Sequence, residues 1–205
     1  LANMDQLDEI PPLALTGQTL LYSVPPQGGC SIDLRTRTFL KALERDQQEP
    51  ERIIYLSASS VYGDTGGALV DETSPAQPTA AMGKRRLDAE QQFSAFAERH
   101  GIPLVILRVS GIYGPGRLPL MQISQGQPLL REELAKPSTR FHVDDLVQVC
   151  LATLQRGQGI YNVSDGAPCS MTAYFNAVAS ALGMPRQPQV DLAEAQRVMP
   201  PLLFT

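Results

Sequence analysis

The chain has 205 residues, 43% of them hydrophobic and 19% charged, with a formal net charge of −4. These values are ordinary for one globular domain, or one domain with a small lobe, and the acidic balance argues against a general nucleic-acid surface. Cys30, Cys150 and Cys169 have no metal-like spacing, which favours a reducing compartment and argues against a disulfide framework. We expect neither a membrane span nor a signal peptide, and therefore a cytoplasmic protein.

The first half of the chain alternates apolar runs with amphipathic stretches. Thr19–Val24 is predicted to be a strand that stops at two prolines, and Thr36–Arg45 to be a surface helix. The run Arg52–Gly63, RIIYLSASSVYG, begins as a strand buried on both faces and ends in small hydroxyl residues. Small residues at the end of such a strand are typical of a ligand site in an open α/β sheet.

A long helix is predicted next, from about Ala80 to Arg99, with Thr79 as its N-cap and Gly101 at its end. The later elements are buried strands at Pro103–Val109 and Gly159–Val163, and helices at Leu146–Gln155, Ala173–Leu182 (capped by Ser170 or Thr172) and Leu192–Val198. Strands that alternate with helices, without hairpin signals, predict an α/β fold with a Rossmann-like, doubly wound parallel sheet. Right-handed crossovers would bring the loops after Val24, Leu56 and Val109 to one ligand-binding edge.

An ordered series of short motifs runs from Leu20 to about Pro185. Its members are Val61-Tyr62-Gly63, Asp71-Glu72, Ala89-Glu90, Leu107-Arg108, Ile112-Tyr113-Gly114-Pro115-Gly116, His142-Val143-Asp144-Asp145 and Tyr161-Asn162-Val163. This series resembles the extended short-chain dehydrogenase/reductases, specifically the NAD-dependent epimerase/dehydratase family. The resemblance implies a Rossmann-like fold, NAD or NADP as the cofactor, a nucleotide-sugar-like substrate, and a homodimer formed through the long helix.

The positions that carry catalysis in this family differ here. The family uses a Ser or Thr near the reacting oxygen, and a Tyr and a Lys one helical turn apart that move the proton and hold the nicotinamide ribose. These positions align with Ala58, Met82 and Arg86. Met82 has no proton to transfer, and Arg86 is a fixed cation with a different reach. The sequence therefore predicts a family member whose acid/base chemistry is lost or relocated.

The Gly-rich nucleotide fingerprint of the family, G-x-G-x-x-G, does not occur before Leu20. We therefore expect the chain to be an incomplete record of a longer protein, with the N-terminal strands of the sheet missing and the C-terminus cut. Residues 1–110 are predicted to be the C-terminal part of a Rossmann-type NAD(P)-binding domain. Residues 111–205 are predicted to be a mixed segment that adds sheet and helix elements and a small substrate-binding lobe.

Candidate site residues lie on the loops of the predicted ligand edge. The candidates for relocated acid/base chemistry are Ser59 and Tyr113. The predicted cofactor contacts are Ser23, Pro25, Ser57, Arg86 and Gly111, and the predicted substrate contacts are Ser60 and Arg117. The simpler alternative for the serines is that small residues close a turn, and for Arg117 that it is a solvated loop residue.

No metal site is predicted, because helix N-capping by Asp144 and Asp145 explains the acidic residues beside His142. Two functional hypotheses follow from the sequence. The first is an NAD(P)-binding epimerase/dehydratase-like protein with weak or relocated oxidoreductase or isomerase chemistry. The alternative is a non-catalytic dinucleotide-binding or sensing module that acts through a protein partner.

Overall fold

A computed structural model describes residues 3–27 and 29–198, which divide into two compact units. Of the described residues, the first unit contains those in 3–63, 70–110 and 146–163, and the second contains those in 64–69, 111–145 and 164–198. The chain thus leaves the first unit after Ser110 and returns to it at Leu146. The segment 111–205 is therefore shared between the units, since its residues 146–163 belong to the first.

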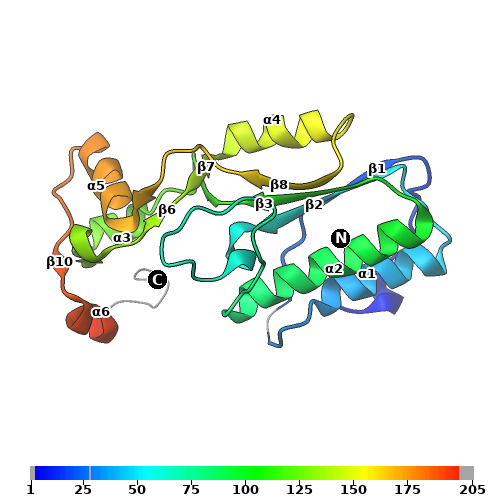
Figure 1. Cartoon of the computed structure of the whole chain (residues 1–205), viewed down its shortest axis with the longest axis horizontal. Helices are drawn as coiled ribbons and strands as arrows, with labels where there is room; N and C mark the ends of the chain where they lie inside the picture. Colours follow the sequence, from blue (N-terminus) through cyan, green and yellow to red (C-terminus); the bar gives the residue numbers. More distant parts are fainter. Residues whose placement is uncertain (1–2, 28, 199–205) are drawn as a thin grey trace. The chain divides into compact units, whose positions relative to one another are not determined.

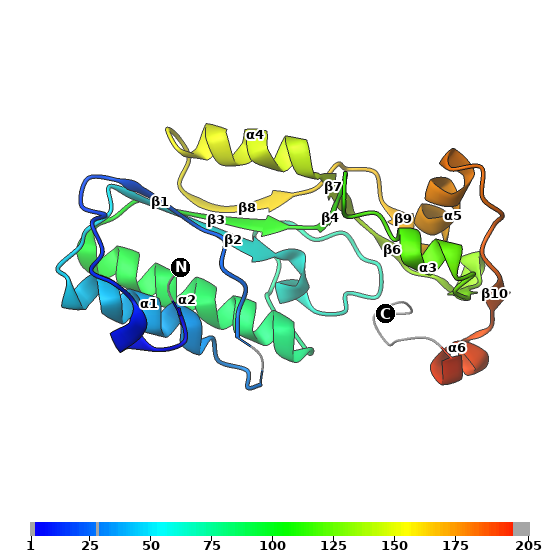
Figure 2. The same ribbon diagram turned by 180° about the vertical axis from the view of Figure 1, so that it is seen from behind.

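The first unit is built on a four-stranded parallel sheet with the order β1-β2-β3-β8. The strands are β1 (Thr19–Tyr22), β2 (Arg52–Ala58), β3 (Leu104–Val109) and β8 (Gly159–Val163). The α/β class and the parallel sheet predicted from the sequence are confirmed. Helices α1 (Leu34–Arg45) and α2 (Ala81–His100) cover one face of this sheet, and α4 (Val143–Thr153) runs along the other (Figures 1 and 2).

An aromatic core fills the space between this sheet and helices α1 and α2. The ring of Tyr22 on β1 lies 5.0 Å, centroid to centroid, from the ring of Phe39 on α1 and from the ring of Phe93 on α2. The Tyr55 ring on β2 also lies 5.0 Å from the Phe93 ring. Tyr55 and Phe93 are fully buried. These contacts tie β1 and β2 to both helices, so the core holds the strand ends in fixed positions.

Strands β1 and β8 are the edge strands of the described sheet. Leu21 on β1 is 42% exposed and Tyr161 on β8 is 40% exposed, whereas β2 and β3 have neighbours on both sides. An apolar run therefore identified the strands, but their exposure depends on their place in the sheet. The prediction of a buried strand at Gly159–Val163 was wrong for this reason.

Helix ends were predicted with mixed success. Gly101 ends α2 in the left-handed conformation, with φ 65°, and Ser170 caps α5 (Met171–Ala181), both as predicted. The prediction that Thr79 caps α2 was wrong, because Ala80 is the N-cap residue and has no side-chain cap bond. Asp33, which the sequence analysis missed, caps α1 by accepting hydrogen bonds from the amides of Arg35 and Thr36.

Gly83, in the first turn of α2, lies directly against the chain that follows β2. A Cβ atom added at Gly83 would collide with the carbonyl oxygen of Ser60 and press on the Pro78 ring. Helix propensity alone predicts that Gly83→Ala stabilises the protein by up to about 1 kcal/mol. We expect the opposite sign, a loss of about 1–3 kcal/mol, because backbone cannot move aside cheaply. Urea unfolding of the variant measures that sign, and a stabilised variant would contradict the close contact.

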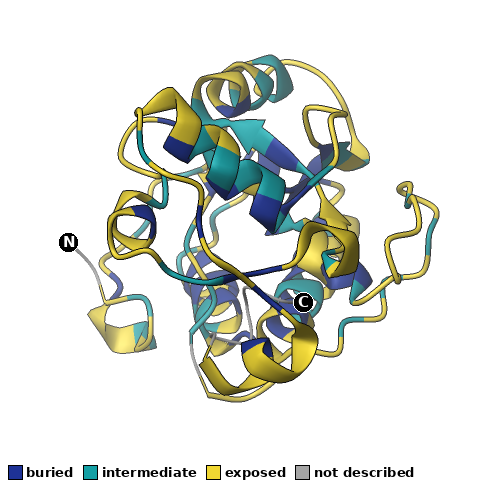
Figure 3. Ribbon diagram, turned by 90° about the vertical axis from the view of Figure 1, so that its left-hand side faces the viewer, coloured by how far each residue is buried: buried dark blue, intermediate teal, exposed yellow. Residues whose placement is uncertain are grey.

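The second unit consists of three two-stranded sheets and short helices. The strand pairs are parallel β4–β7 (Gly111–Tyr113, Arg140–His142), parallel β5–β10 (Leu129–Leu130, Gln189–Val190) and antiparallel β6–β9 (Pro137–Ser138, Cys169–Ser170). The helices of this unit are α3 (Leu120–Ser124), α5 and α6 (Leu192–Val198), and short 3-10 helices η1 (Leu7–Glu9), η2 (Ser59–Tyr62) and η3 (Glu132–Leu134) complete the chain. In helix α5, Thr172, Phe175 and Ala179 are buried and Ala177, Ser180 and Ala181 are exposed. Figure 3 colours the ribbon by how far each residue is buried.

No helix in the described residues is both long and apolar enough to cross a membrane.

Candidate functional site

The carboxyl ends of β1, β2 and β3 lie at one edge of the sheet because the strands are parallel. Ser23 and Pro25, two of the predicted cofactor contacts, follow β1 and are exposed there. The strand β2 ends at Ala58, and the chain then turns into the 3-10 helix η2. This edge is where open α/β sheets bind their ligands.

A buried layer of polar side chains lies directly beneath this edge. Ser57, Arg108 and Asn162 occupy neighbouring register positions on β2, β3 and β8, so their side chains share the sheet face that α2 covers. Glu90 on α2 accepts a hydrogen bond from the Ser57 hydroxyl and receives Arg108 Nη2 at 2.8 Å and Nε at 3.2 Å. The side chains of Glu90 and Arg108 are only 4% and 5% exposed. Glu90 therefore ties β2 and β3 to α2 through buried polar contacts.

Tyr62 joins this layer to η2. Its ring centroid lies 4.8 Å from the Arg108 guanidinium carbon, and its hydroxyl donates to Asn162 Oδ1 at 2.8 Å. The backbone amide of Asn162 in turn donates to the Glu72 carboxylate at 2.7 Å. Tyr62 is thus a packing residue under the loop, and the layer fixes η2 on the end of the sheet.

The three positions aligned with the family's catalytic residues have distinct surroundings. Ala58 is in register with Val109 and lies on the face opposite to Ser57. Met82 is 59% exposed in the first turn of α2. Arg86 donates from Nη1 to the Leu56 carbonyl oxygen at 2.8 Å and to the Tyr55 hydroxyl at 3.4 Å. Arg86 therefore holds the end of β2 with its guanidinium.

The Tyr55 hydroxyl beside Arg86 is a poor proton donor. Burial raises the pKa of Tyr55 to about 12, although the neighbouring Arg86 cation lowers it in part. A phenol with this pKa stays neutral at physiological pH and acts as a structural hydrogen-bond group. Tyr55 does not replace the missing tyrosine.

Ser59 and Ser60, the predicted catalytic and substrate-binding serines, are exposed on η2. Because β2 ends at Ala58, the alternation of side chains stops there, and Ser59 lies on η2 rather than on the strand face of Ser57. Ser57 is buried and its hydroxyl is committed to Glu90. The predicted ligand contacts of all three serines stay predictions.

A cofactor of the NAD type fits the edge in part. The Ser110 hydroxyl, at the end of β3, is buried and has no hydrogen-bond partner among the described residues. An orphaned hydroxyl of this kind is suited to a ribose hydroxyl or an amide. Arg86, Ser23 and Pro25 border the same parallel strand ends. Gly111, the first residue of β4, is exposed, and a Cβ there would make only ordinary van der Waals contacts, 3.5 Å from Arg140 Cγ and from the Thr139 carbonyl oxygen, so that position has no packing need for glycine.

The second unit contains a cluster that sequence reasoning missed, centred on Arg140 of β7. Arg140 is only 8% exposed and forms no salt bridge with a carboxylate in the described part of the chain. Its guanidinium carbon lies 4.1 Å from the centroid of the Tyr174 ring. Tyr113 and His142 are register partners on β4 and β7, with ring centroids 5.1 Å apart, and they share a face with Arg140. The cluster is thus a buried cation stacked on the Tyr174 ring, which in turn lies beside the Tyr113 ring.

One weak sign of this cluster is visible in the sequence. The stretch Arg140-Phe141-His142 places a basic residue on each side of an aromatic one, shortly before the Asp144-Asp145 motif. A cation inside an apolar, strand-like stretch is a candidate for a buried ligand contact. Arg117, the predicted substrate contact, is exposed in the turn after β4, and its role stays a prediction.

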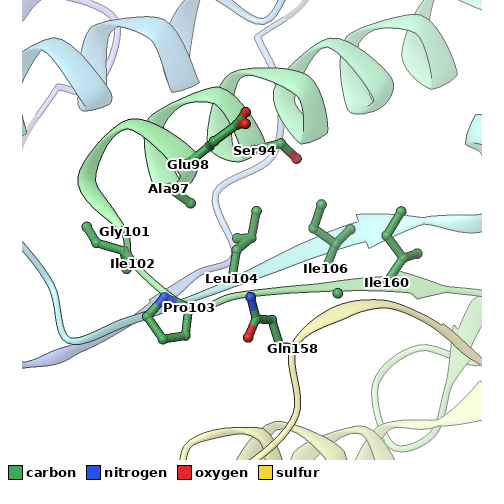
Figure 4. Close-up of a pocket in the computed structure, with 11 residues that line it drawn as sticks. Ser94, Ala97, Glu98, Gly101, Ile102, Pro103, Leu104, Ile106, Gln158 and Ile160 are labelled. Carbon is green, nitrogen blue, oxygen red and sulfur yellow. The ribbon is translucent and has the colours of Figure 1, made fainter.

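A pocket of about 480 Å³ lies at the amino-terminal end of the sheet, between α2 and β8 (Figure 4). Its floor is apolar and includes Leu104, Ile106 and Ile160, with Glu98 and Gln158 on the rim. Ser94 also lines it, and it lies at the end of the strands opposite to the candidate edge. Among the described residues no cluster of three or more His, Cys, Asp or Glu side chains could hold a metal ion.

Comparisons with known proteins agree with these features. The chain is 31% identical over 123 residues to the dTDP-D-glucose 4,6-dehydratase of Mus musculus, an alignment that covers 55% of the chain and 35% of that protein. It is 30% identical over 138 residues to Protein YeeZ of Escherichia coli K12, covering 65% of the chain and 47% of that protein. The chain therefore spans between about a third and a half of the length of these relatives.

Two solved structures are similar over most of the chain. A functionally unknown conserved protein from Silicibacter pomeroyi is 34% identical with a TM-score of 0.75, covering 96% of this chain and 66% of that one. MoeE5, solved in complex with UDP-glucose and NAD, is 25% identical with a TM-score of 0.68, covering 84% of this chain and 64% of that one. The Rossmann-like fold is shared.

The family assignment comes from a direct match. The sequence model of the NAD dependent epimerase/dehydratase family matches residues 34–164, which include α1, the polar layer and the Arg140 strand. The chain is thus an epimerase/dehydratase-like protein, and it belongs to the NAD dependent epimerase/dehydratase family.

Proposed function

We propose that this protein binds NAD or NADP and a nucleotide-sugar-like substrate, and that it performs oxidoreductase or isomerase chemistry with relocated acid/base groups. Family membership supports the cofactor, and the UDP-glucose and NAD bound by MoeE5 support the substrate class. The nicotinamide, when bound, would accept and return a hydride. The residues of this chain would bind the ligands and move the proton.

The observation that carries the proposal is the buried guanidinium of Arg140, which pairs with no carboxylate in the described part of the chain. A buried cation is costly unless an anion satisfies it, and the hydrogen bonds of Arg140 go to the sulfur atoms of Cys169 and Met171 and to one carbonyl oxygen. The diphosphate of a nucleotide sugar would supply that anion in the bidentate geometry that arginine favours. The Tyr174 ring, stacked on the guanidinium, would shield that contact from water.

The remaining roles are assigned as part of this proposal. Ser59 or Tyr113 would exchange the substrate proton in place of the absent tyrosine. Ser23, Pro25, Ser57, Arg86 and Gly111 would contact the cofactor, and Ser60 and Arg117 the substrate. A homodimer and a cytoplasmic location complete the proposal. Arg86 would present its remaining N–H groups to a ribose while it keeps its bond to Leu56.

Titration calorimetry with UDP-glucose tests the substrate part. Arg140→Met is expected to weaken binding about 10- to 100-fold, because a hydrogen bond to a charged group is worth about 1.5–3 kcal/mol. Arg140→Lys, which keeps the cation, should lose less. Arg186→Met, at an exposed position of the same unit, is the matched control and should bind as the unaltered protein does.

Nicotinamide fluorescence tests the cofactor part. If the unaltered protein binds neither NAD(H) nor NADP(H), or if Arg140→Met binds UDP-glucose unchanged, the proposal is wrong. Binding of both ligands with no turnover over a panel of nucleotide sugars would contradict the catalytic part and favour a non-catalytic binding module instead.

A further inference from the structure

The three cysteines have different surroundings. Cys169, on β9, is partly buried, and its sulfur lies 3.2 Å from Arg140 Nη1. Cys30 is exposed, and its thiol donates to the Ile32 carbonyl oxygen at 3.2 Å. Cys150, on α4, is partly buried, and burial raises the pKa of its thiol. Among the described residues, Cys169 is the one cysteine of the three whose sulfur contacts a cationic side chain.

The other hydrogen-bond partners of Arg140 explain why its contact with the Cys169 thiol matters. Its Nη2 points to the Met171 sulfur at 3.5 Å, and its Nη1 also reaches the Cys169 carbonyl oxygen at 3.4 Å. None of these acceptors carries charge when Cys169 is a thiol. Among these contacts of the buried guanidinium, the Cys169 sulfur is the one that can become an anion. Cations next to thiols are the surroundings in which cysteines react as thiolates.

We infer that Cys169 is a modification site whose thiolate, paired with Arg140, reacts with small disulfides. In this step the Cys169 thiolate attacks one sulfur of a disulfide such as oxidised glutathione. A new S–S bond forms on Cys169, the old S–S bond breaks, and the released thiolate takes up the proton that Cys169 lost. The disulfide is the oxidant and is reduced by the exchange. Its carboxylates suit the neighbouring guanidinium.

Modification at this place has a consequence for ligand binding. A group attached to Cys169 would occupy the space around Nη1 of Arg140 and compete with any other anion there. This consequence rests on the proposed function, because it assumes that Arg140 binds the substrate diphosphate. The reactivity of the thiol does not depend on that assumption, and it is measured without any substrate.

Peptide mass spectrometry after timed exposure of the whole chain to oxidised glutathione at pH 7 tests the reactivity. Each cysteine is followed separately, in the folded chain and in urea, where the three thiols lose their surroundings. We expect folding to increase the rate at Cys169 by about tenfold, and to leave Cys30 unchanged or slower. Cys150 should react more slowly when folded, because its thiol is partly buried and has no cation contact.

Variants at Arg140 assign the cause. Arg140→Met should remove the acceleration at Cys169 without changing the rate at Cys30, and Arg140→Lys should keep part of it. If the second unit of Arg140→Met fails to fold, the comparison between folded and urea rates in the unaltered chain still decides the matter. A folded rate at Cys169 equal to or below its rate in urea would overturn the inference. So would an acceleration that survives Arg140→Met with its fold intact.

Calorimetry with UDP-glucose on the glutathionylated chain separates this inference from the proposed function. Fast modification together with lost UDP-glucose binding supports both. Fast modification of a protein that binds no UDP-glucose supports the modification site and contradicts the substrate.

Discussion

Replacing Glu90 with alanine is expected to lower the free energy of unfolding by about 3–5 kcal/mol, measured by urea denaturation. The variant leaves the Arg108 guanidinium buried and without its carboxylate, 2.8 Å from where Glu90 Oε2 was, and it also removes the acceptor of the Ser57 hydroxyl. Arg108→Leu should lower the free energy of unfolding by a similar amount, because it leaves the Glu90 carboxylate buried without its cation. These are large effects beside the small net stability of a domain.

The matched control is the exposed pair of Glu44 and Arg99, whose atoms lie 3.1 Å apart and whose side chains are 41% and 62% exposed. Glu44→Ala should cost at most about 1 kcal/mol, because water replaces the lost partner. The double variant Glu90→Gln with Arg108→Leu should be less destabilised than the sum of its single variants, since no charge remains buried. Equal losses at Glu90 and Glu44 would refute the dry environment of the polar layer.

Restoring the family's catalytic side chains is expected to raise turnover strongly. The triple variant Ala58→Ser, Met82→Tyr, Arg86→Lys should react about 10²- to 10⁴-fold faster with a nucleotide sugar and NAD, the range that a positioned acid/base group contributes. The surroundings favour this result, because Met82 is exposed in the first turn of α2 and has room for a phenol. Arg86 lies one helical turn further, where a lysine can reach the same edge.

The control for this experiment differs by one hydroxyl. The variant Ala58→Ser, Met82→Phe, Arg86→Lys has the same ring at position 82 without its proton, so it should stay at the level of the unaltered protein. If the two triple variants turn over equally, the phenol is not placed to transfer a proton and the alignment on Met82 fails. Initial rates at saturating cofactor, with melting curves for each variant, give the comparison.

Local sequence pattern predicted the elements of the first unit well. Apolar runs located β2 and β3, and helical periodicity with Gly101 located α2, because these features act over a few neighbouring residues. The exposure of β1 and β8 could not be predicted in the same way. Whether an apolar strand is central or at an edge depends on which strands lie beside it, and those are separated from it by 30 residues or more along the chain.

The candidate site was predicted only in part, for a related reason. The edge and the family's substituted positions follow from motif spacing. The polar layer does not, because Ser57, Glu90 and Arg108 come from three elements and look like unrelated polar residues in the sequence. Arg140 was missed because its significance depends on the absence of a carboxylate partner among the described residues. Whether a cation has such a partner is visible only in three dimensions.

The Glu72 contact has a consequence for self-association. Within the described sheet β8 has β3 as its neighbour on one side, so the amide of Asn162 that donates to Glu72 points away from β3. Free amides along an edge strand are the groups through which sheets of separate molecules join. The Glu72 carboxylate takes the place that the carbonyl of a foreign strand would need, and its charge repels a second copy carrying the same residue. The Glu72 side chain thus blocks strand pairing at one amide of this edge, that of Asn162.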